Sequence, residues 1–119
     1  MSQNFQPGDF LVFQLEAGFA LLRLLAIDAD DREKVWHVAA YGEFFPDVEA
    51  AESASATPTA LTKSSAHVPL TNRAFESTQV ARIANLPLEP ADLELLEAWR
   101  RDENGEVSDR SVRLMLGLR

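Results

Sequence analysis

The two histidines of this chain, His37 and His67, are the side chains that come nearest to a reactive or metal-binding centre. Each lies in a run of residues typical of a β-strand, so adjacent strands would bring the two rings together. Two imidazoles and a carboxylate can hold Zn²⁺ or Fe²⁺, and Glu43, Asp47 and Glu49 are the accompanying carboxylates. The spacing matches no known run of ligands, and a strand histidine more often serves as a hydrogen-bond partner. A metal site is therefore the alternative, with His37 and His67 as its candidate ligands.

Other patterns of catalytic residues are missing from the sequence. The absence of cysteine removes thiol nucleophiles, thiolate metal sites and disulfides together. Ser64 and Ser65 lie in low-complexity sequence, and no Gly-x-Ser-x-Gly elbow surrounds a serine. The five glycines are scattered singly, so no glycine-rich phosphate loop is formed. We predict no catalytic residues, no cofactor and a protein that is not an enzyme; the alternative is a small metal-dependent enzyme that uses the two histidines.

Residues 41–49 have the most unusual composition of the chain, with three aromatic side chains, three carboxylates and a proline at the end of a predicted strand. In one interpretation Phe44 and Phe45 fill one end of the sheet and Pro46 turns the chain. In the other, an exposed aromatic and acidic patch binds a basic protein surface. The candidate binding residues are Tyr41, Glu43, Phe44, Asp47 and Glu49.

Charge is distributed unevenly along the chain, whose formal net charge is −8. Residues 1–60 hold ten Asp and Glu against three Lys and Arg, whereas residues 61–119 hold nine against eight. An acidic surface repels phosphate backbones and anionic membranes and attracts basic partners. We expect a protein partner that is basic, and neither nucleic acid nor a membrane; acidity also serves solubility by itself.

The length and the apolar content predict one folded domain over residues 1–119. A hydrophobic fraction of 46% supplies enough apolar area to exclude general disorder, and 119 residues suit one core. The N-terminal residues lack the basic and apolar regions of a signal peptide, and no apolar run reaches the roughly 20 residues of a spanning helix. Together with the absence of cysteine, these features predict a cytoplasmic protein.

The first half of the chain is predicted to form a β-meander, because apolar runs over 10–15, 19–27 and 35–41 are separated by short turns that carry Gly or Asp. The run 19–27 is apolar on both faces apart from Arg23, so a barrel wall, a docked helix or a second subunit must cover each side. A helix is the competing interpretation of this run. Gly18 at its start and the missing polar face favour a strand.

The middle of the chain gives weaker signals. Residues 50–65 are rich in Ala, Ser, Thr and Glu, which is typical of a mobile segment, with a short helix over 47–54 as an alternative. Residues 67–70 form a short strand that Pro69 confines to an edge of the sheet. Phe75 is expected in the core. Residues 77–84 suit a strand or one or two helical turns, and we favour the strand.

A helix over 90–101 is the best-defined local element. Pro90 suits the first helical position, acidic side chains lie near the N-terminal end, and Arg100 and Arg101 lie at the C-terminal end. Leu95, Leu96 and Trp99 form its predicted buried stripe. A last element over 108–118 suits a helix better than a strand, although its apolar residues also alternate.

The opening of the chain resembles the start of the immunity protein 26 family of bacterial toxin systems. The resemblance lies in Phe5, Gly8-Asp9-Phe10-Leu11-Val12-Phe13, Gly18-Phe19-Ala20 and Arg23-Leu24-Leu25, and it covers about the first third of the chain. It implies a cytoplasmic binding protein that neutralises a cognate toxin. The acidic front half would then suit a basic nuclease as the target.

These observations predict an α+β domain in which a curved antiparallel meander or partly open small barrel, of about four to six strands, packs against one or two C-terminal helices. The predicted core comprises Leu11, Phe13, Leu22, Leu24, Trp36, Leu96 and Trp99. We predict a non-enzymatic protein-binding module, immunity-like or otherwise. A self-associating structural protein, in which a second copy covers the apolar face of 19–27, is a further alternative.

Overall fold

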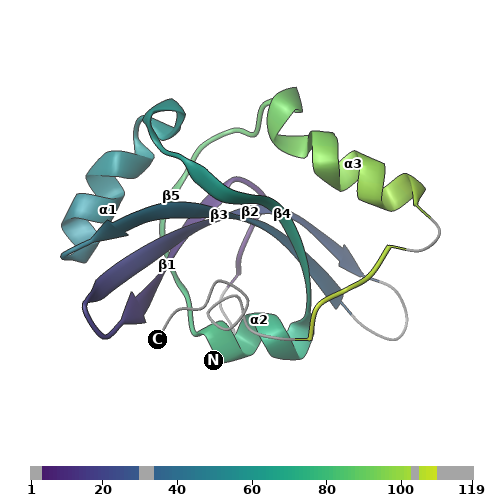
Figure 1. The fold of residues 1–119 in the computed structure, drawn as a ribbon, viewed down its shortest axis with the longest axis horizontal. Coiled ribbons are helices and arrows are strands. Elements are labelled where there is room, and N and C mark those ends of the chain that lie inside the picture. Colours follow the sequence, from purple (N-terminus) through teal and green to yellow (C-terminus); the bar gives the residue numbers. More distant parts are fainter. Residues whose placement is uncertain (1–3, 30–33, 103–104, 110–119) are drawn as a thin grey trace.

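A computed structural model describes residues 4–29, 34–102 and 105–109 and shows an α+β fold built on one antiparallel sheet (Figure 1). The five strands lie in the order β4-β3-β2-β1-β5, and the sheet is curved but not closed. The strands are β1 (Asp9–Leu15), β2 (Gly18–Ala29), β3 (Lys34–Phe45), β4 (Lys63–Thr71) and β5 (Ala81–Asn85). The predicted meander is therefore confirmed, and the apolar run over 19–27 is a strand.

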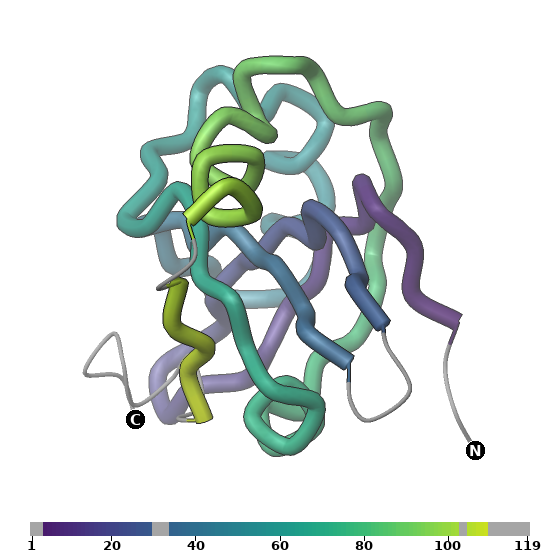
Figure 2. Tube along the Cα trace, turned by 90° about the vertical axis from the view of Figure 1, so that its right-hand side faces the viewer, coloured from purple at the N-terminus to yellow at the C-terminus, as the bar shows by residue number. Residues whose placement is uncertain are grey.

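Helices cover both faces of the sheet. Helix α2 (Asn72–Thr78) packs below it, while α1 (Val48–Ser55) and α3 (Glu94–Arg101) lie above its two ends (Figures 1 and 2). The lower core contains Leu11, Phe13, Leu22, Leu24, Trp36, Val38, Leu70 and Phe75. The upper core has two parts, one with Phe10, Leu21 and Tyr41 near α1 and one with Leu25, Ala39 and Leu96 under α3. Elements of this chain thus account for the two-sided apolarity of β2.

The strand predicted over 77–84 is confirmed for residues 81–84, which lie in β5, whereas Ser77 and Thr78 belong to helix α2. Thr71 caps the helix, since its hydroxyl accepts a hydrogen bond from the amide of Ala74 at 3.1 Å. Phe75 is buried as predicted and stacks on Trp36 with ring centroids 4.0 Å apart. This tertiary contact outweighs the weak local preference for a strand.

The segment over 50–65, whose composition predicted mobility, contains α1, the 3₁₀ turn η1 (Pro58–Ala60) and the start of β4. Asp47 caps α1 by accepting the amide hydrogen of Ala50 at 2.7 Å. Small side chains let this helix lie close to the sheet, with Ala51 and Ser55 buried. The alternative helix over 47–54 is thus confirmed, as is the position of β4 at an edge of the sheet.

The helix predicted over 90–101 divides into a 3₁₀ turn, η2 (Pro90–Leu93), and α3, which ends at Arg101. Leu96 is buried and Trp99 is half-buried, but the prediction for Leu95 was wrong, because 54% of it is exposed. The other predicted core residues are buried. The element predicted over 108–118 lies outside the described residues apart from Ser108 and Asp109, and Ser108 forms a parallel bridge to Leu70. Among the described residues, no helix has the length and apolar content that crossing a bilayer requires.

Candidate functional site

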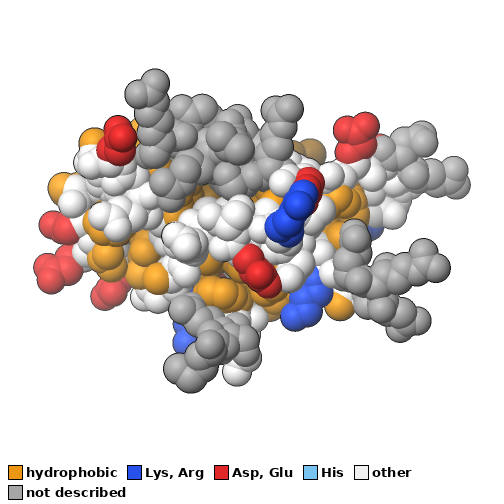
Figure 3. Space-filling model, turned by 90° about the horizontal axis from the view of Figure 1, so that it is seen from below, with side chains coloured by type: hydrophobic (Ala, Val, Ile, Leu, Met, Phe, Trp, Pro, Cys, Tyr) orange, Lys and Arg blue, Asp and Glu red, His pale blue; other side chains and the backbone are white. Residues whose placement is uncertain are grey.

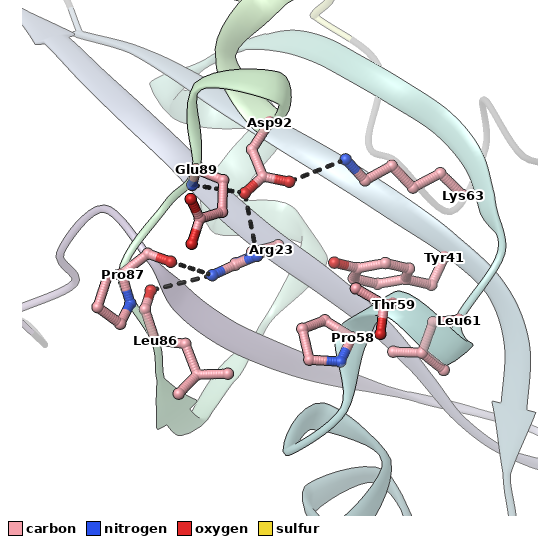
Figure 4. A pocket seen from close by; sticks show the side chains of 10 residues that line it. All are labelled: Arg23, Tyr41, Pro58, Thr59, Leu61, Lys63, Leu86, Pro87, Glu89 and Asp92. Atoms are coloured by element: carbon pink, nitrogen blue, oxygen red, sulfur yellow. Dashed lines mark hydrogen bonds and ion pairs between the residues drawn. The ribbon is translucent and has the colours of Figure 1, made fainter.

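A cavity of about 630 Å³ opens above the middle of the sheet, where the segment after α1 faces η2 (Figure 4). The sheet contributes side chains from β2, β3 and β4, and the two 3₁₀ turns and the loop before η2 contribute the rest. Its lining comprises Arg23, Tyr41, Pro58, Thr59, Leu61, Lys63, Leu86, Pro87, Glu89 and Asp92. The cavity therefore combines charged groups with apolar walls, as ligand-binding sites do.

Arg23 is the buried cation of this cavity, and only 3% of it is exposed. Its Nη2 donates to the carbonyl oxygens of Leu86 at 3.0 Å and Pro87 at 3.1 Å, and its Nη1 donates to Oδ2 of Asp92 at 3.5 Å. Its Nε is buried and has no hydrogen-bond partner within the described parts of the chain. A charge this deep is stable only when it is paired and hydrogen-bonded, so the loop over 86–92 has to close over β2.

Asp92 balances the two cations of the lining. Its Oδ1 accepts from Nζ of Lys63 at 3.3 Å, and its Oδ2 accepts from the amide of Glu89 at 2.8 Å as well as from Arg23. Burial raises the pKa of Asp92, but these hydrogen bonds and the nearby charges outweigh burial and lower it overall. Glu89 is exposed, and its carboxylate accepts from the amide of Asp92 in a capping box.

Tyr41 lies in the wall of the cavity with 3% of its surface exposed. Its hydroxyl points toward Arg23 in Figure 4, and its ring stacks on Phe10 with centroids 6.2 Å apart. Burial raises the pKa of Tyr41, so the hydroxyl keeps its proton at neutral pH. The sequence grouped Tyr41 with an exposed acidic patch, whereas the structure places it in the cavity.

Gly8 connects the loop that carries Leu86 to strand β2 through backbone hydrogen bonds. Its carbonyl accepts from the amide of Leu86 at 3.2 Å, and its amide donates to the carbonyl of Leu24 at 2.7 Å. Its φ is +93°, and a Cβ at this position would lie 2.4 Å from the carbonyl oxygen of Leu86. Only glycine fits both the backbone conformation and the close approach.

The histidine pair forms a second polar centre, on the same face of the sheet under α3. Nδ1 of His37 is 2.9 Å from Nε2 of His67, and Nε2 of His37 is 3.0 Å from Oδ2 of Asp28. The ring planes differ by 16° and their centroids are 5.1 Å apart, so the two facing nitrogens lie between the rings. His37 therefore donates from Nε2 to the carboxylate and accepts at Nδ1 from His67. The predicted approach of the two rings is confirmed.

Helix α3 covers this pair. The Trp99 ring meets His37 and His67 edge-on, at centroid distances of 4.8 and 6.0 Å. Nε of Arg100 donates to Asp28 at 3.2 Å, and this bond lowers the pKa of Asp28 despite partial burial. Burial lowers the pKa of His37 against the pull of Asp28, and burial with the charges of His37 and Arg100 lowers that of His67 to about 4. Both histidines are neutral at pH 7.

The carboxylates that the sequence assigned to the histidine pair lie elsewhere. The carboxylate that contacts His37 is Asp28, whereas Glu43 accepts the amide of Thr62 with both oxygens, at 3.0 and 2.9 Å. Asp47 caps α1, and Glu49 is exposed in the first turn of that helix. Within the described ranges, no three His, Cys, Asp or Glu side chains are arranged to hold a metal ion.

The third candidate surface, which we call the acidic end, comprises Phe44, Asp47, Val48 and Glu49. Phe44 is 56% exposed and Val48 37% exposed, and the two carboxylates are also exposed. Phe45, by contrast, packs into the upper core, so the two predicted roles of this aromatic pair are divided between its members. In Figure 3 acidic side chains gather at the end of the molecule that holds α1 in Figure 1, with apolar side chains beside them.

Comparisons of this chain with protein-family models, with curated proteins and with solved structures found no match. The resemblance to the immunity protein 26 family therefore stands on the N-terminal residues alone.

Proposed function

We propose that this protein is a non-enzymatic protein-binding module whose acidic end binds a basic surface of its partner. The exposure of Phe44 carries the proposal, because a large aromatic side chain in water at the end of a strand costs solvation free energy unless a partner covers it. Val48, four residues further along, is also exposed. Aromatic side chains in such positions supply much of the binding energy of protein interfaces.

Charge around the acidic end supports a basic partner. Residues 35–62 carry four carboxylates and neither Lys nor Arg. Asp47 and Glu49 flank Val48 in the sequence, and both carboxylates are exposed. An acidic rim around an apolar centre steers a basic surface into contact and selects against acidic ones.

Within this class we propose an immunity-like role, in which the protein neutralises a basic toxin domain in the cytoplasm. The opening residues from Phe5 to Leu25 support this role through their resemblance to immunity protein 26, and the absence of cysteine suits a reducing compartment. Such a role needs a stable binding surface and no catalytic groups.

Affinity capture from a native lysate, with the protein as bait at low and high salt, tests the proposal. Two variants alter the acidic end, Phe44→Ser and Glu49→Lys. Each has a matched control on α3, since Leu95→Ser removes an apolar side chain that is 54% exposed and Glu94→Lys reverses a charge in the first turn of that helix. We expect one basic protein to be captured, released by salt, lost from the first two variants and retained by the controls.

Retention of the same partner by Phe44→Ser and Glu49→Lys would contradict the assignment of the acidic end. Capture of the chain itself and nothing else would replace the proposal with self-association. Recombinant mixing of the captured partner with the protein, followed by light scattering, gives the stoichiometry of the complex.

A further inference from the structure

The cavity of Figure 4 presents hydrogen-bond donors that its described acceptors do not fully engage. Both oxygens of Asp92 are occupied, by Lys63, Arg23 and the amide of Glu89. A lysine ammonium has three N–H donors, and the structure gives Lys63 this one acceptor. Nε of Arg23 also lacks a partner among the described residues, but its burial keeps it out of reach of a ligand. A ligand that completes the hydrogen bonds of Lys63 must therefore bring acceptors.

The lining carries two cations and two carboxylates. Arg23 and Lys63 both pair with Asp92, so one carboxylate serves two cations inside the cavity. The second carboxylate of the lining, that of Glu89, is exposed and directed to the backbone of η2. The lining as a whole is therefore neutral, and the exposed Lys63 is the cation whose remaining N–H groups can attract an anion.

The walls around these donors are apolar. Pro58 and Leu61 line one side of the cavity and Leu86 and Pro87 the other (Figure 4). The volume of about 630 Å³ is that of a small-molecule site, for which roughly 300–1,000 Å³ is usual. A ligand that fits this lining has an apolar body and an acceptor head.

We propose that this cavity binds a small apolar monocarboxylate, of the aromatic or branched aliphatic class. The carboxylate lies against Lys63 and the hydroxyl of Tyr41, and the apolar body lies between Leu61 and Leu86. An amine of the same shape would meet the Lys63 ammonium with a like charge, and an amide would lack the negative charge that attracts the ammonium. This site is separate from the acidic end, so it goes beyond the protein-binding function and does not depend on it.

Nuclear magnetic resonance titration of the ¹⁵N-labelled protein tests the proposal, with phenylacetate and 4-methylpentanoate as probes. We expect dissociation constants on the order of 1 mM or tighter, because the probes are small. The shifted amides should be those around Leu61, Lys63 and Leu86. Phenylacetamide should bind about tenfold more weakly than phenylacetate, since it lacks the charge-assisted hydrogen bond, and 2-phenylethylamine should not bind.

Three variants complete the experiment. Lys63→Met and Tyr41→Phe each remove one donor and should weaken phenylacetate binding, by about tenfold for the charged group. Lys34→Met is the matched control, because Lys34 is an exposed lysine at the start of β3, whereas Tyr41 lies near the end of this strand. The affinity of the Lys34→Met variant for phenylacetate should equal that of the wild type. Amide spectra establish whether each variant is folded. If Lys63→Met does not fold, Tyr41→Phe provides the test of the proposal.

Equal affinities for phenylacetate and phenylacetamide would overturn the proposal, as would shifts that map away from the cavity. Absence of binding by both carboxylates would overturn it as well. None of these outcomes bears on capture of a basic protein by the acidic end.

Discussion

Nδ1 of His37 lies 2.9 Å from Nε2 of His67, and the far nitrogen of His37 bonds Asp28. The chain from carboxylate to buried imidazole to half-buried imidazole places three polar side chains under α3. Each facing nitrogen already has a hydrogen-bond partner in the other ring. Burial stabilises the neutral forms of both rings, against the pull of Asp28 on His37, and makes the pair sensitive to acid.

Replacement of His67 by Gln should reduce the acid sensitivity of folding. The pKa of His67 is about 4 in the folded protein against 6.5 ordinarily, so the unfolded chain takes up a proton that the folded chain refuses between these values. Stability is therefore complete above pH 6.5 and falls as the pH drops toward 4. Denaturation with urea at pH 7 and pH 5 should show a larger loss in wild type than in His67→Gln. An equal loss in the two proteins would show that His67 does not titrate in this way.

Zinc should bind the protein only weakly at pH 7. Binding to both rings would break the hydrogen bond between His37 and His67, and no third ligand is in place among the described residues. Titration with Zn²⁺ or Co²⁺ and elemental analysis of protein purified without chelator measure this directly. Stoichiometric metal that is lost in His67→Gln would instead favour the metal-dependent alternative.

Replacement of Asp92 by Asn should destabilise the protein by about 3 kcal/mol, because it leaves the buried Arg23 without its counter-charge. Glu97→Gln is the matched control, since it removes an exposed pair with Arg100 on α3 and should cost less than about 0.5 kcal/mol. Urea denaturation at neutral pH compares the two. A loss in Asp92→Asn no greater than that in Glu97→Gln would refute the assigned role of Asp92.

Replacement of Gly8 by Ala should destabilise the protein by more than about 2 kcal/mol, since it combines a left-handed backbone with a clash against Leu86. Gly42→Ala provides the comparison, because the nearest atoms to a Cβ there lie 3.7 Å away, in ordinary contact. That variant should change stability by less than about 0.5 kcal/mol. Thermal melts of the two variants measure the difference, and similar melting temperatures would argue against the close packing of Gly8 on the 86–87 loop.

Local patterns of sequence were sufficient for the meander and for the C-terminal helix. Alternation and turn residues depend on neighbours a few positions away, so β1, β2 and β3 were predictable as strands. The end of the helix at Arg101 followed from the charges in its last turn. Helix α2 was not predictable, because its stability comes from the contact of Phe75 with Trp36, which lies far away in the sequence.

The polar centres depended on the tertiary structure to different degrees. His37 and His67 could be placed together from the sequence, since both lie on strands and adjacent strands were a reasonable expectation. The carboxylate that contacts His37 could not be identified from the sequence. The reason is that β2 pairs with β3 through a register shift between Leu24 and Ala26, which brings Asp28 near His37. Two-residue periodicity does not reveal where a bulge occurs.

The sequence by itself determined the strands, the acidity of the front half and the presence of an isolated Arg23 in an apolar strand. Only the tertiary structure decided that Asp92, 69 residues away, pairs with Arg23, and that Phe44 is exposed while Phe45 is half-buried against the upper core. The physical reason is that secondary structure follows from short-range sterics and hydrogen bonding. Burial and charge pairing follow from which distant segments share the same face of the sheet.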